Sequence, residues 1–139
     1  MLYIAYGSNM DIDQMYYRCP HAAYVGTAVL DGWRLMFKGS KTGSYATIER
    51  EAGCKVPVVL WDIDQLDEEY LDRYEGWPTF YYKTELFVPR YGRAMVYIMH
   101  EERKLGKPSG RYYGILDDAY RRFRFPRQIL KDALAYSRA

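Results

Sequence analysis

The tetrapeptide Tyr6-Gly7-Ser8-Asn9 follows the apolar run Leu2-Tyr3-Ile4-Ala5 and precedes polar residues that open a helix at Asp11. This order predicts a buried strand, a tight turn and a helix start in immediate succession. The glycine permits a sharp backbone path, and serine and asparagine are residue types that cap helices. Free N–H groups of such a turn lie beside the positive end of a helix dipole, where a carboxylate or phosphate is favoured. The turn is therefore a candidate anion site.

The rest of the chain alternates between runs typical of strands and a few helical segments. Strands are expected at residues 2–5, 22–37, 45–49, 56–63, 81–88 and 94–99, the last two forming a hairpin. The segment 22–37 is either one bent strand or two strands broken at Asp31-Gly32. Helices are expected at 11–18, 64–74, 109–123 and 126–135, with Asp64 and Ser109 as N-caps, and a polar turn is expected at 38–43.

Consecutive strands of this kind do not show the βαβα alternation of a doubly wound sheet. We therefore expect an α+β fold, in which helices flank a small mixed, mostly antiparallel β-barrel. Ligand sites tend to lie at the mouth of such a barrel. With 139 residues the chain has the usual size of one domain, so a single domain over 1–139 is expected.

Composition argues against several classes of function. The 20 Lys and Arg residues against 18 Asp and Glu residues leave a formal charge of +2, which gives no argument for a nucleic-acid or membrane partner. Two cysteines outside any CxxC motif and only two histidines argue against a disulfide framework and a zinc site. No apolar run approaches the length of a membrane span, and no signal-peptide pattern opens the chain, so a soluble cytoplasmic protein is expected.

A second distinctive stretch, Leu71-Asp72-Arg73-Tyr74-Glu75-Gly76-Trp77-Pro78, ends the helix expected at 64–74. Glu75 lies at the negative end of the helix dipole and near the shoulder of the apolar face. A carboxylate among apolar and aromatic neighbours should have a raised pKa and is a candidate proton carrier. Local sequence leaves open the alternative of a solvent-facing glutamate before a C-cap glycine.

Other reactive residue types fit a catalytic role less well. Ser8 has no evident histidine base, and its turn lacks the flanking glycines of a nucleophile elbow. Cys19 precedes Pro20 at a helix end, which does not lower a thiol pKa, so it is interpreted as a packing residue. Acidic residues accompany the arginines of segment 121–127, which favours a solvated helix face over an RNA-binding surface.

Together, these stretches resemble the γ-glutamylcyclotransferase-like (AIG2-like) superfamily, in order and over nearly the whole chain. The most specific elements are the Tyr-Gly-Ser-Asn turn and the Glu-Gly-x-Pro segment that begins at Glu75. The other matching segments are Arg18-Cys19-Pro20, residues 26–37, Tyr45-Ala46-Thr47-Ile48, Leu60-Trp61-Asp62-Ile63, Tyr81, and Pro108-Ser109 with Tyr112.

The resemblance implies that a γ-glutamyl amide is cyclised to 5-oxoproline with release of the amine. It implies that Glu75 is the general base and acid, and that Tyr81 lines the site, although strand alternation leaves the adjacent Tyr82 as the alternative. The γ-glutamyl moiety would be held by Tyr6, Gly7, Ser8 and Asn9. No cofactor and no metal is expected, because the substrate's own α-amine is the nucleophile.

The expected partner is a small γ-glutamyl compound, bound by a monomer or homodimer. Its leaving group is expected at the barrel mouth, against the loops 38–44 and 101–108. Two alternatives remain open: a catalytically idle small-molecule binding module on the same fold, and a cyclotransferase for a larger γ-glutamyl-protected intermediate.

Overall fold

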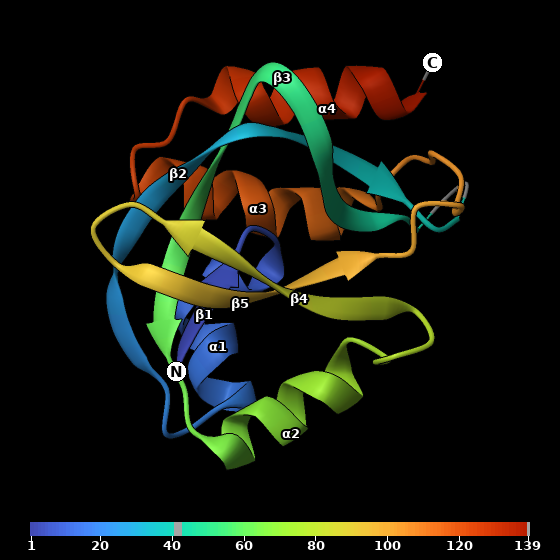
Figure 1. Ribbon diagram of the computed structural model, residues 1–139. Helices are drawn as coiled ribbons and strands as arrows, with labels where there is room; N and C mark the ends of the chain where they lie inside the picture. The colour runs from blue at the N-terminus through green and yellow to red at the C-terminus, as the bar shows by residue number, and fades with distance from the viewer. Residues whose placement is uncertain (41–42, 139) are drawn as a thin grey trace.

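Five strands form one sheet in the order β2-β3-β1-β5-β4 in the computed structural model, which describes residues 1–40 and 43–138 (Figure 1). Neighbouring strands pair antiparallel, except that β1 and β5 run parallel at Tyr3 and Met95. Strand β1 lies at the centre, so the turn that follows it begins inside the molecule. The strands are β1 (Leu2–Ala5), β2 (Ala23–Lys38), β3 (Tyr45–Asp62), β4 (Tyr81–Val88) and β5 (Gly92–Met99).

The helices lie around this sheet. Helix α4 packs against β2, and α3 packs against α4 and against the short 3-10 helix η1 that follows β1. Helix α2 is preceded by Asp64, which forms a reciprocal capping box with Asp67, and Ser109 caps α3, as the sequence predicts. The helices are η1 (Ser8–Met10), α1 (Ile12–Arg18), α2 (Gln65–Tyr74), α3 (Gly110–Arg122) and α4 (Arg127–Arg138).

The expected α+β class and the mostly antiparallel sheet are confirmed. The sheet does not close into a barrel, because β2 pairs only with β3 and β4 only with β5 within the described ranges. Barrel is therefore a loose description of a curved, open sheet. Among residues 1–40 and 43–138, no helix combines the length and apolar character needed to cross a membrane.

The β2–β3 hairpin is longer and more irregular than the sequence suggests. A single strand covers Tyr45–Asp62, where two strands were expected. Opposite Gly32, the pairing register jumps from Arg50 to Lys55, so a bulge takes up the residues that were interpreted as a break. Gly32 and Gly53 have φ values of +81° and +86°, which suit glycine at this irregularity. Strand β2 is the one bent strand of the two alternatives.

The core holds the turn after β1 in place. Met10 and Met15 are fully buried, as is Trp61 of β3. The Trp61 indole Nε1 donates a hydrogen bond of 3.0 Å to the backbone oxygen of Asn9. The buried methionine side chains and this hydrogen bond both hold η1 in place. The turn therefore has a defined position relative to the sheet.

Two loops pack closely beside the sheet. Gly39 N donates to Lys104 O at 3.0 Å, and Gly106 N donates to Phe37 O at 3.1 Å. These contacts join the loops 38–44 and 101–108, in which residues 41 and 42 of the expected polar turn lie outside the described residues. A Cβ at Gly106 would overlap the backbone oxygen of Ser40.

Gly106→Ala should therefore lower the free energy of unfolding by about 1–3 kcal/mol, because a backbone atom cannot move aside as a side chain can. Urea unfolding followed by tryptophan fluorescence measures this. Gly110→Ala is the matched control, since a Cβ there would meet nothing within 4 Å. Equal stability of the two variants would contradict the close packing of these loops.

Candidate active site

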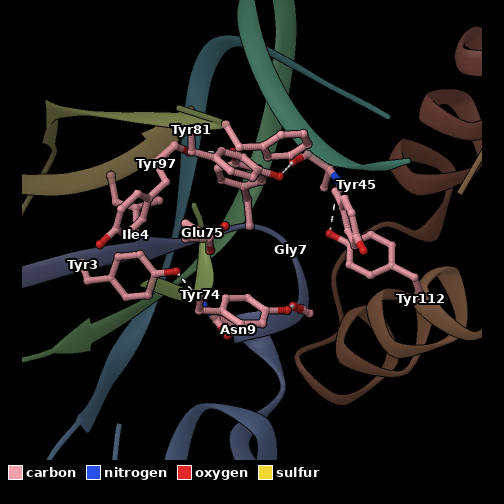
Figure 2. A pocket seen from close by; sticks show the side chains of 14 residues that line it. Tyr3, Ile4, Gly7, Asn9, Tyr45, Tyr74, Glu75, Tyr81, Tyr97 and Tyr112 are labelled. Carbon is pink, nitrogen blue, oxygen red and sulfur yellow. Dashed lines mark hydrogen bonds between the residues drawn. The ribbon is translucent and has the colours of Figure 1, made fainter. Parts of the chain in front are cut away.

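A cavity of about 180 Å³ lies at the carboxyl end of β1 (Figure 2). Its volume is below the range of about 300–1,000 Å³ typical of sites for drug-sized ligands, so it suits a group the size of one amino acid. Eight of its 14 lining residues are aromatic. Its lining includes every residue that the sequence proposed for the site: Tyr6, Gly7, Ser8, Asn9, Glu75 and Tyr81.

Glu75 follows α2 as its C-cap, and its N–H donates to Leu71 O at 2.8 Å. Figure 2 shows its carboxylate among the tyrosine rings. Within the described chain, that carboxylate has no hydrogen-bond or ion-pair partner. Burial raises the pKa of Glu75 from 4.5 to about 7, and the positive charge of Arg18 partly opposes this rise. Such a group can take up and release a proton near neutral pH.

The turn itself differs from the prediction in its capping. Ser8 and Asn9 were expected as helix caps, but Asp11 is the N-cap of α1, where its side chain accepts from Gln14 N at 2.9 Å. The reason is that η1 separates the turn from α1, and its own N-cap, Gly7, offers no side chain. The backbone N–H groups of residues 7–9 donate no hydrogen bond to any described residue. They are free to bind an anion in the cavity they line.

Asn9 contributes to the site through its backbone. Its side-chain Oδ1 accepts from Arg18 NH1, and its Nδ2 donates to the Tyr3 hydroxyl at 2.9 Å. Because both ends of the amide are engaged, this side chain holds the turn in shape.

Tyr6 and Tyr81 form walls of the cavity. The Tyr6 hydroxyl donates to Tyr97 O at 2.6 Å, and the Tyr81 hydroxyl donates to Ala46 O at 2.8 Å. Burial raises the pKa of both phenols well above the ordinary value, so they stay neutral. Between the alternatives left by strand alternation, Tyr81 faces the cavity, while Tyr82 donates to the Glu101 carboxylate outside it.

The hydroxyls of two tyrosines that line the cavity, and that local sequence did not indicate as site residues, are available as hydrogen-bond donors. The Tyr3 hydroxyl accepts from Asn9 Nδ2, and the Tyr112 hydroxyl accepts from Ala46 N at 3.1 Å. No described residue accepts from either phenol, so both can donate to a bound molecule. A tyrosine on a short buried strand is a usable signal, because its hydroxyl needs a partner inside the protein.

A possible metal-binding group lies away from this cavity. In the described part of the chain, His21, Asp64 and Asp67 bring ligand atoms within 4.8 Å of one another. They lie at the start of α2, at the opposite end of the helix from Glu75. Asp64 and Asp67 form the capping box there, and His21 Nδ1 lies 3.1 Å from Asp64 Oδ2. Helix capping accounts for the cluster.

Comparison with known proteins gives a consistent result. The family model described as "Gamma-glutamyl cyclotransferase, AIG2-like" matches residues 3–121. Gamma-glutamylcyclotransferase from Bos taurus is 34% identical over 95 residues, covering 63% of this chain and 48% of that protein. The Homo sapiens protein of the same name is 37% identical over 82 residues, which covers 54% of this chain and 44% of that protein. The match thus spans about half the length of these relatives.

A solved structure gives the same assignment. One titled "Gamma-glutamyl cyclotransferase" superposes with a TM-score of 0.83 at 26% identity, covering 96% of this chain and 85% of that one.

Proposed function

The chain belongs to the γ-glutamyl cyclotransferase, AIG2-like, family, and we propose that it converts a γ-glutamyl amide into 5-oxoproline and a free amine. One observation carries this proposal. A buried carboxylate with a pKa of about 7 shares an amino-acid-sized cavity with the N–H groups of residues 7–9, and neither has a hydrogen-bond partner among residues 1–40 and 43–138.

The proposed reaction needs no protein nucleophile. The substrate's α-amine attacks its own γ-carbonyl carbon, so that a C–N bond forms and closes a five-membered ring. The original amide C–N bond then breaks. Glu75 accepts the proton that the ammonium group must lose before it attacks, and the ring nitrogen loses a second proton as the new amide forms. Both protons pass through Glu75 to the departing nitrogen, which leaves as an ammonium ion. The ordinary pKa of an α-amine is about 7.7–8.0 or above, and a Glu75 pKa of about 7 is much better matched to it than that of an unperturbed glutamate.

The cavity favours the folded-back shape that this attack requires. In our proposal, the N–H groups of Gly7, Ser8 and Asn9 bind the α-carboxylate, and the aromatic walls enclose the carbon chain. Holding the amine against the carbonyl can contribute several kcal/mol to catalysis. The free hydroxyls of Tyr3 and Tyr112 can donate to oxygens of the substrate.

The leaving group would extend out of the cavity, because about 180 Å³ leaves little room beyond the γ-glutamyl moiety. Tyr45 and Tyr74, which line the cavity, keep 46% and 45% of their surface exposed and would contact that group. The proposal therefore extends to amides of amino acids, of simple amines, and of larger amines.

The test is to incubate the protein with γ-glutamyl amino acids and γ-glutamyl amines and to measure 5-oxoproline by mass spectrometry. Formation of 5-oxoproline by the wild-type protein, with little or none from Glu75→Gln, is the expected result. If no compound reacts but some bind with chemical-shift changes at Gly7 to Asn9, the protein is a binding module instead.

A further inference from the structure

Arg18, the last residue of α1, connects the two halves of the proposed site. Its NH1 donates to Ser8 Oγ at 3.3 Å and to Asn9 Oδ1. Its guanidinium carbon lies 3.5 Å from the centre of the Tyr74 ring, and Tyr74 directly precedes Glu75. Arg18 is not one of the 14 residues that line the cavity. It therefore contacts the turn on one side and the end of α2 on the other without reaching into the cavity.

The contact with Asn9 controls the orientation of the turn. With Oδ1 held by Arg18, the amide nitrogen of Asn9 is directed to the Tyr3 hydroxyl at 2.9 Å. A charge-assisted hydrogen bond is stronger than a neutral one, and the planar guanidinium holds two acceptors in a fixed geometry. Loss of this contact would free the Asn9 side chain and loosen the backbone N–H groups beside it.

Arg18 also provides the permanent charge that acts on Glu75. Beside Glu75 lie phenols of β1, of the turn that follows it, and of β4, β5 and α3. These phenols stay neutral because burial raises their pKa values: Tyr3, Tyr6, Tyr81, Tyr97 and Tyr112. On α2, Tyr74 lies beside Arg18, and the Asp72 carboxylate is engaged by Lys83 at 3.0 Å and by the Tyr97 hydroxyl at 2.6 Å.

We propose that Arg18 is a positioning residue that couples the anion-binding turn to Glu75. Through Ser8 and Asn9 it holds the N–H groups that grip the substrate, and through its charge it stabilises the ionised Glu75 carboxylate. This rests on the proposed function for the substrate-binding half, whereas the effect on Glu75 exists in the free protein and can be measured there.

Two substitutions separate charge from geometry. Arg18→Met removes the positive charge and the hydrogen-bond donor but keeps an apolar side chain against Tyr74. Arg18→Lys keeps the charge but loses the planar guanidinium donor. The Glu75 carboxyl is titrated by ¹³C NMR in the free protein, with Glu75→Gln identifying its signal. In Arg18→Met the Glu75 pKa should rise by about 0.5–1 unit, less than the shift typical of a contact ion pair. In Arg18→Lys it should stay near the wild-type value.

Steady-state kinetics test the hydrogen bonds from Arg18 to the turn. In both variants KM for a γ-glutamyl substrate should rise about tenfold, as for the loss of a charge-assisted hydrogen bond. Arg73→Met is the matched control, since this exposed arginine lies two residues before Glu75 but is not among the causes of the Glu75 pKa shift, which are burial and the Arg18 charge. Neither readout should change in this variant. An unchanged Glu75 titration in Arg18→Met, or an unchanged KM in both Arg18 variants, overturns the inference. A wild-type protein that makes no 5-oxoproline refutes the proposed function, and the titration still decides the role of the charge.

Discussion

Glu75→Gln should lower turnover of a γ-glutamyl amide by at least about 100-fold, the low end for removing a general acid–base residue. Glutamine has nearly the same shape as glutamate but can neither accept the amine proton nor deliver it to the leaving nitrogen. The substitution breaks no hydrogen bond of the described chain, because the Glu75 carboxylate makes none there. Initial rates of 5-oxoproline formation under single-substrate conditions measure the effect, and wild-type activity in the variant would refute the mechanism.

Stability provides the control for that variant. Because the pKa of Glu75 is raised from 4.5 to about 7, the folded protein holds this proton more tightly than the unfolded chain does. The resulting stabilisation is complete below pH 4.5 and is lost as the pH rises through 7. Glu75→Gln should therefore be more stable than wild type at pH 8, by up to about 3 kcal/mol, and equally stable at pH 4. An inactive variant that unfolds more easily at pH 8 would instead indicate damage to the fold.

Elements with strong local signals could be predicted from the sequence. Asp64 and Ser109 cap the helices they were expected to cap, and β4 covers the residues 81–88 that were proposed for it. The continuous β3 could not be predicted in this way. The segment around Gly53 has turn-type composition, and only the pairing with β2 across a bulge keeps it within the strand.

The candidate site shows the same division between local and long-range information. The turn and Glu75 can be recognised from short motifs, but the partners of the phenols depend on which strands become neighbours. The Tyr81 hydroxyl reaches the backbone of Ala46 on β3, 35 residues away along the chain. Arg18 at the end of α1 meets Ser8 at the start of η1, ten residues away along the chain. No periodicity or propensity encodes such contacts.

The dependence of kcat/KM on pH should show an acid limb with a midpoint near pH 7. Glu75 must be ionised to accept the proton of the substrate's ammonium group, and burial raises its pKa to about 7. Below that midpoint the rate should fall about tenfold per pH unit, which gives a loss of about two orders of magnitude between pH 8 and pH 5. The substrate's ammonium group stays protonated below pH 7, so its own titration does not contribute to the fall in kcat/KM below that pH.

Initial rates at low substrate concentration from pH 5 to pH 8 measure this limb. Residual activity of Glu75→Gln should vary little over the same range, because the titrating group is absent. A midpoint near 4.5 in the wild-type protein would contradict a carboxyl whose pKa is raised by burial, and with it the role of Glu75 in this limb. A midpoint near 7 that disappears in Glu75→Gln assigns the limb to this buried carboxylate, and with it the proton transfer on which ring closure depends.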